Sequence, residues 1–112
     1  LFVWGHYTPL YVLAQRLPGT RYPNTSVQMG NFDPLHLAAD FDPARTTSQR
    51  DVELALRDLQ ARRPRFVVDT APADIHGWSK IPLEKFPSLD AFVQQHYALI
   101  GTPGGARVYE SK

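Results

Sequence analysis

Cysteine is absent from this 112-residue chain. Its absence excludes disulfide bonds, thiolate metal sites and a cysteine nucleophile, although it does not fix the compartment. An excess of one charge is also lacking, because 12 Lys and Arg residues nearly balance 11 Asp and Glu residues, for a net charge of +1. Proteins that bind nucleic acids usually concentrate basic residues on one face, so this balance argues against that class.

Long apolar runs are lacking as well. No stretch approaches the roughly 20 residues that a membrane-spanning helix needs, and no secretory signal peptide is recognisable. The chain opens with Leu1 rather than Met, inside a run that is typical of a buried strand. A natural N-terminus rarely starts there, so we expect this chain to be a fragment of a longer protein.

The composition that remains is that of an ordinary globular protein, with 43% hydrophobic and 21% charged residues. A chain of this length suits one domain with one core. We therefore predict a single soluble domain over residues 1–112.

The first part of the chain predicts a strand, a helix and a second strand. The apolar run 1–4 stops at Gly5 and is typical of a central strand. Thr8 followed by Pro9 favours a helix start. Residues 20–22 can form a second, short strand. The apolar residues that would form one buried face of the helix are Leu10, Leu13, Ala14 and Leu17.

The clearest helix is predicted over residues 48–63. Ser48 stands three residues before Asp51, which resembles a capping box. Asp58 belongs to one of two i,i+4 ion pairs expected on the exposed side. Residues 65–70 are then predicted to form another buried parallel strand, because apolar residues fill the centre of this segment.

The last part of the chain predicts one more helix and a hairpin. Ser88 is the expected cap of the helix, whose apolar face includes Tyr97. Residues 98–101 are a predicted strand, and residues 106–110 return after a Pro-Gly-Gly turn as an edge strand.

Alternation of strands and helices implies parallel βαβ units with right-handed crossovers. We therefore predict a three-layer, Rossmann-like α/β fold. Its sheet would be mostly parallel in the order 2-1-3-4-5, with an antiparallel C-terminal hairpin strand. Ligands of such folds bind at the C-terminal ends of the parallel strands.

Two segments, 23–47 and 71–87, are longer than the usual connection of about 4–6 residues. Each is either a functional loop or a cover over the sheet. Two histidines and two carboxylates gather near the predicted strand ends and the second of these segments: His6, Asp69, Asp74 and His76. Such side chains could bind a metal or share a proton. Loop and capping roles are favoured, because no tight ligand spacing such as H-E-x-x-H occurs. We predict no metal site and no cofactor.

Aromatic residues suggest another kind of site. Flat rings suit the apolar side of a sugar, although most aromatic residues simply fill cores. Trp78 stands in a polar loop and is expected to be the most exposed of them. The predicted binding edge at the strand ends consists of Gly5, His6, Tyr7, Asp69, Thr70 and Trp78.

A pattern of structural positions runs through almost the whole chain. Its segments are Val3-Trp4-Gly5, Leu10-Tyr11-Val12-Leu13, Thr20-Arg21-Tyr22, Arg63-Pro64-Arg65-Phe66-Val67-Val68-Asp69-Thr70, Phe86-Pro87-Ser88-Leu89, His96-Tyr97 and Val108-Tyr109. This pattern resembles the soluble C-terminal domain of bacterial relatives of dolichyl-phosphate-mannose–protein mannosyltransferases. Those proteins are multi-pass GT-C glycosyltransferases that use lipid-phosphate sugar donors.

The resemblance implies an extracytoplasmic, periplasmic domain of a multi-pass membrane protein. Its partners would be the membrane-embedded portion of its own chain and a glycan or protein acceptor. The family's acidic catalytic residues lie in loops of the membrane portion, so the resemblance places no catalytic residue in this chain.

Three functional hypotheses remain open. The chain could be an accessory domain that positions the acceptor or gates access to a membrane-embedded active site. It could be a stand-alone α/β module that binds a small ligand, or a small enzyme that uses His6 and Asp69.

Overall fold

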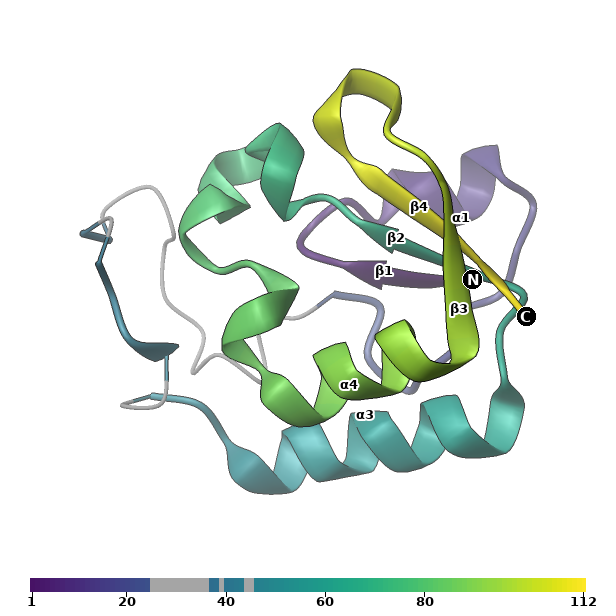
Figure 1. Ribbon diagram of the computed structural model, residues 1–112, viewed down its shortest axis with the longest axis horizontal. Coiled ribbons are helices and arrows are strands. Elements are labelled where there is room, and N and C mark those ends of the chain that lie inside the picture. Colours follow the sequence, from purple (N-terminus) through teal and green to yellow (C-terminus); the bar gives the residue numbers. More distant parts are fainter. Residues whose placement is uncertain (25–36, 39, 44–45) are drawn as a thin grey trace.

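The computed structural model of the protein describes residues 1–24, 37–38, 40–43 and 46–112. Within them, four strands form one sheet in the spatial order β1-β2-β4-β3 (Figure 1). The strands are β1 (Phe2–Trp4), β2 (Phe66–Asp69), β3 (Tyr97–Gly101) and β4 (Arg107–Ser111). The α-helices are α1 (Pro9–Leu13), α3 (Gln49–Arg62) and α4 (Pro87–His96).

The sheet is mixed, and the predicted mostly parallel, five-stranded Rossmann-like order is wrong. Of the described strands, only β1 and β2 run parallel, with Val3 opposite Val68. β4 runs antiparallel to both β2 and β3. The short turn between β3 and β4 pairs them as a hairpin, and β4 occupies the position beside β2. β4, expected at the edge, therefore lies inside the sheet, and β3 is an edge strand.

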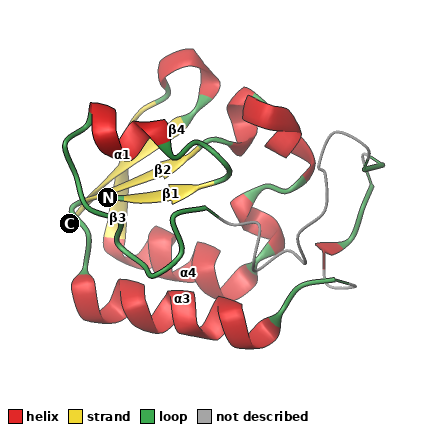
Figure 2. Cartoon of the chain, turned by 180° about the vertical axis from the view of Figure 1, so that it is seen from behind, coloured by secondary structure: helices red, strands yellow, loops and turns green. Residues whose placement is uncertain are grey.

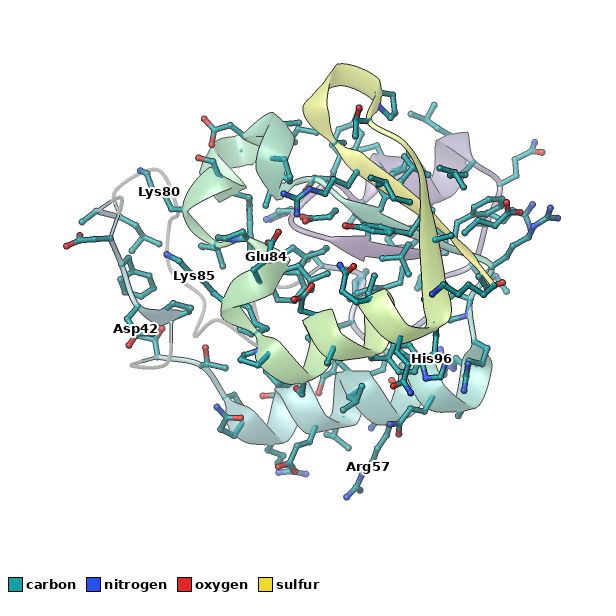
Figure 3. The ribbon with its side chains drawn as sticks, in the orientation of Figure 1. Asp42, Arg57, Lys80, Glu84, Lys85 and His96 are labelled. Atoms are coloured by element: carbon teal, nitrogen blue, oxygen red, sulfur yellow. The ribbon has the colours of Figure 1, made fainter. Side chains whose placement is uncertain are left out.

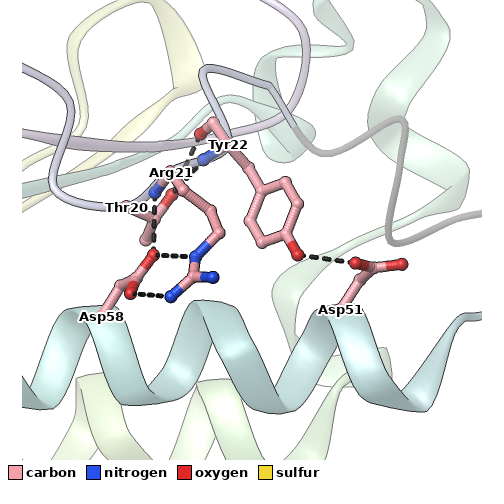
Figure 4. Close-up of polar contacts among 5 residues, drawn as sticks. All are labelled: Thr20, Arg21, Tyr22, Asp51 and Asp58. Carbon is pink, nitrogen blue, oxygen red and sulfur yellow. Dashed lines mark hydrogen bonds and ion pairs between the residues drawn. The ribbon is translucent and has the colours of Figure 1, made fainter.

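Residues 20–22 do not form the predicted second strand. The Thr20 hydroxyl bonds locally, donating to the carbonyl of Tyr22 and accepting from its N–H. The N–H of Arg21 donates to Asp58 Oδ2 on α3 at 2.8 Å (Figure 4). A helix carboxylate thus satisfies the backbone group that a strand ladder would have used.

Helix α3 confirms the clearest sequence prediction. Ser48 Oγ accepts a hydrogen bond from the N–H of Asp51 at 3.3 Å, as the capping pattern predicted. Asp58, expected on the exposed side, is buried and accepts two hydrogen bonds from the Arg21 guanidinium, at 2.9 and 3.0 Å. Asp51 accepts one from the hydroxyl of Tyr22 at 2.6 Å (Figure 4). Asp51 and Asp58 of α3 therefore hold the chain that follows α1.

Helix α1 is shorter than its apolar pattern predicts. It ends at Leu13, because Gln15 adopts a left-handed backbone with φ of 52° and the N–H of Arg16 bonds back to the carbonyl of Tyr11. That bond closes the helix in the manner of a Schellman turn. Tyr11 is the buried residue of this helix, and its hydroxyl accepts from the N–H of Val3 at 3.3 Å.

Helix α4 begins at Pro87, with Phe86 in the capping position and no side-chain cap. The predicted cap at Ser88 is therefore wrong. Tyr97, expected on the helix, is the first residue of β3, and its hydroxyl donates to the carbonyl of Pro64 at 2.7 Å.

The two faces of the sheet are covered unequally, because alternate strand residues point to opposite faces. Figure 2 shows α3 and α4 stacked together, with α1 apart from them. The main core includes Phe2, Trp4, Leu59, Val67, Leu89 and Val93. The smaller cluster on the α1 side is Leu1, Val3, Tyr11, Val68 and Ala106. The burial of Val67 and Val68 confirms that β2 is a buried strand.

The long segment 71–87 folds over the main core as three short 3-10 helices. These are η3 (Ala71–Ala73), η4 (Ile75–Lys80) and η5 (Leu83–Lys85). They bury Trp78, Ile81 and Leu83, and Trp78 is only 2% exposed. The prediction that Trp78 is exposed is therefore wrong, and this segment is a cover. Most of the other long segment, 23–47, lies outside the described residues.

Candidate functional site

The C-terminal ends of β1 and β2 are joined by hydrogen bonds, which we call the strand-end junction. The N–H of Thr70 donates to the carbonyl of Trp4 at 3.0 Å, and its hydroxyl donates to the same oxygen at 2.7 Å. Gly5 has a φ of 117°, and a Cβ there would lie 2.0 Å from Thr70 Oγ1. Only glycine fits this position without rearrangement. The structure thus brings together Gly5 and Thr70, two of the predicted site residues.

Three side-chain rings gather beside the strand-end junction. The His6 and His76 ring centroids lie 5.9 Å apart, and those of Tyr7 and His76 lie 6.4 Å apart. Both histidines are exposed, and Tyr7 is half-buried. We call these three residues the ring cluster. It offers flat surfaces, imidazole nitrogens and a phenol to a ligand or partner from solvent.

His76 reaches the ring cluster through an unusual backbone. Its φ of 55° lies in the left-handed region, as does the φ of Asp74 at 54°. Asp74 Oδ1 accepts a hydrogen bond from the N–H of Ser79 at 3.1 Å, which holds this turn. The turn therefore uses the Asp74 carboxylate for structure.

Asp69 lies inside the protein rather than on the predicted binding edge. Its side chain is fully buried, and Oδ1 accepts from the N–H of Ala71 at 3.0 Å. Oδ2 lies 3.7 Å from Arg107 Nη1 and has no hydrogen-bond partner among the described residues. Burial raises the pKa of Asp69 to about 6, and the positive charge of Arg107 opposes that rise. In the described part of the chain, the Asp69 carboxylate contacts the Ala71 N–H and the Arg107 guanidinium, so it does not form an acid–base pair with His6.

Arg107 is a residue that the sequence analysis missed. It stands opposite Asp69 in the pairing of β2 and β4, and its guanidinium also binds the carboxylate of Glu84 on η5. Figure 3 labels Glu84 between the sheet and α4. No sequence signal could reveal this contact once β4 was expected at the sheet edge. The side chains of Asp69, Arg107 and Glu84 thus link β2, β4 and η5, from a buried carboxylate at Asp69 to an exposed one at Glu84.

The other predicted features add little chemistry. Trp78 fills the core, and its Nε1 has no hydrogen-bond partner among the described residues. Across all the residues that the structure describes, no group of three or more His, Asp or Glu side chains could hold a metal ion. The arrangement therefore offers a surface for recognition, and the Asp69 carboxylate, whose pKa is raised by burial, lies away from solvent.

Comparison with protein-family models, curated proteins and solved structures yields no match for this chain. Within the described residues, no helix combines the length and the apolar character that crossing a membrane requires.

Proposed function

We propose that this chain is a periplasmic accessory domain of a membrane glycosyltransferase that uses a lipid-phosphate sugar donor. The transfer chemistry is carried by the membrane-embedded portion of the same protein. The proposal is supported by the sequence resemblance and by one structural observation. The strand-end junction presents the ring cluster to solvent and leaves Asp69 buried.

The geometry favours recognition over catalysis. A general base must reach the proton that it removes, but Asp69 is enclosed and is bound to Ala71. His6 and His76 are exposed on a rigid base, where their rings can contact a sugar, a phosphate or an acceptor protein. The ring cluster is therefore the surface that would position an acceptor or contact the membrane-embedded portion.

The first test concerns the parent protein. The coding sequence upstream of Leu1 should specify several apolar spans of about 20 residues each. An upstream sequence without any such span would remove the proposal. The 112-residue chain alone should not transfer sugar from a lipid-phosphate donor, and transfer by it would also contradict the proposal.

The second test concerns the ring cluster in the full-length protein. His6→Ala combined with His76→Asn removes both exposed rings, and Asn tolerates the positive φ at position 76. We expect reduced transfer activity with an unchanged melting temperature of the isolated domain. Arg57→Ala is the control, because Arg57 is exposed on α3 and points away from the body of the protein (Figure 3). Full activity in the double variant would exclude the ring cluster from function.

A stand-alone module for a small ligand is the second candidate, and the same exposed rings favour it. Such a module would bind a sugar phosphate without any membrane portion. Titration of the chain with a hexose phosphate, followed by NMR of the His6 and His76 side chains, separates the two proposals. Saturable shifts at both histidines favour the module, whereas unchanged spectra favour the accessory domain.

A further inference from the structure

The segment from Val12 to Leu17, which begins inside α1, exposes an unusual amount of aliphatic surface. Val12 is 79% exposed, Leu13 is 71% exposed and Leu17 is 86% exposed. Leu13 and Leu17 belong to the apolar stripe that the sequence predicts to be buried. A single exposed leucine needs no explanation, but three large aliphatic side chains within six residues mark an interaction surface.

An apolar pocket lies beside this segment, on the α1 side of the sheet. Its volume is about 290 Å³. Its lining includes Phe66, Val68 and Val108 from the sheet. On the other side, Leu10 of α1 and Ala14, the residue after α1, contribute to it. The pocket exists because α1 is short and covers only part of this face. The exposed aliphatic side chains and the pocket together leave this side of the sheet incompletely covered.

Arginine residues border the apolar surface. The Arg16 guanidinium lies 5.5 Å from the centre of the Phe66 ring and has no carboxylate partner among the described residues. Arg62 borders a second hollow together with Leu17. Arg65 also stacks on Phe66, at 5.2 Å, and is neutralised by Glu110. The surface thus combines aliphatic side chains with unneutralised positive charge at Arg16.

We propose that this surface docks on a bilayer that contains anionic phospholipid. The surface is defined by Val12, Leu13, Arg16 and Leu17, and we call it the α1 surface. Aliphatic side chains can enter the boundary between headgroups and acyl chains, while arginine binds the phosphates above it. Because the Arg16 guanidinium has no carboxylate partner among the described residues, its positive charge is available to a lipid phosphate. The inference goes beyond the proposed function and rests on these side chains alone.

The test is co-sedimentation of the chain with vesicles. One set contains phosphatidylcholine and phosphatidylglycerol in equal amounts, and the other contains phosphatidylcholine alone. We expect tighter binding to the anionic vesicles, and weaker binding as salt is added, because salt screens the arginine–phosphate attraction. Leu13→Ser with Leu17→Ser should lower the partition coefficient about tenfold or more, since two leucine side chains no longer insert. Arg16→Gln should lower it for anionic vesicles only.

Two matched variants control for general effects. Leu99→Ser removes a leucine that is 54% exposed on β3, and Arg57→Gln removes an exposed arginine from α3. Neither should alter vesicle binding. Circular dichroism should show that all variants keep the wild-type melting temperature, because every substituted side chain is exposed.

Three results would overturn the inference. The first is no binding to anionic vesicles, and the second is binding that Leu13→Ser with Leu17→Ser leaves unchanged. The third is a dimer in analytical ultracentrifugation that the same double variant dissociates, because the α1 surface would then bind a second copy. None of these results bears on the ring cluster, so the proposed function is tested separately.

Discussion

The two faces of the sheet differ in how completely the chain covers them. On one face, α3, α4 and the segment 71–87 enclose a core that contains both tryptophans, Trp4 and Trp78. On the other face, α1 buries Tyr11 and leaves Leu13 and Leu17 exposed beside an apolar pocket. An apolar helical stripe therefore identifies residues that need a cover, but it does not identify what provides that cover.

The largest expected effect separates the two faces directly. Leu59 is fully buried in the main core, so Leu59→Ala should lower the free energy of unfolding by about 2–5 kcal/mol. Urea denaturation of the purified chain measures this. A loss below about 1 kcal/mol would mean that the main core is not packed as described.

The buried carboxylate of Asp69, on the main-core side of the sheet, should make the free energy of unfolding depend on pH. The folded pKa of Asp69 is about 6, above its ordinary value of 3.8. Between these values the folded state holds the proton more tightly than the unfolded state, so the free energy of unfolding falls as pH rises from about 4 to 6. The upper limit of this fall is about 3 kcal/mol.

Asp69→Asn should remove that fall, because asparagine does not titrate. Chemical denaturation from acid to neutral pH compares the variant with wild type. Asp74→Asn is the control, since the Ser79 hydrogen bonds lower the pKa of that exposed carboxyl. An equally steep fall in Asp69→Asn would show that another group is responsible.

A smaller effect is expected where α3 holds the chain after α1. Asp58→Ala removes the acceptor of the Arg21 N–H and guanidinium, which should cost about 1–3 kcal/mol. The Arg21 hydrogen bond lowers the pKa of Asp58, so this contribution is present at neutral pH and is lost as pH falls below about 4. Thermal denaturation at neutral and acid pH measures both. The idea fails if the variant is as stable as wild type at neutral pH.

The smallest effect is expected on the α1 surface. Leu13→Ala should change the free energy of unfolding by less than about 0.5 kcal/mol, since Leu13 is 71% exposed. A loss comparable with that of Leu59→Ala would show that the α1 side is as well packed as the main core.

Local patterns predicted much of the fold, and long-range pairing did not follow from them. The strands β1 and β2, the helix α3 and its Ser48 cap follow from apolar runs and capping residues. The position of β4 depends on which strand its hairpin meets, which no local pattern contains. The backbone at residues 20–22 bonds to Asp58, a partner distant in the sequence.

The candidate site was predictable to a similar extent. The meeting of Gly5 and Thr70 follows from two parallel strands that end side by side. The ring contacts of His76 depend on its left-handed backbone, and the burial of Trp78 depends on how the segment 71–87 folds back. Polar neighbours in the sequence suggested exposure for Trp78, but tertiary packing overrode them.

Val67 and Val68 provide the most direct test of the difference between the two faces. They are adjacent in β2, yet Val67 points into the main core and Val68 borders the pocket on the α1 side. Urea denaturation of Val67→Ala and Val68→Ala gives two changes in unfolding free energy for the same chemical substitution. We predict that Val67→Ala costs more, by about 1 kcal/mol, because its cavity is enclosed on all sides. Equal losses, or a larger loss for Val68→Ala, would contradict the account that one face is closed and the other open.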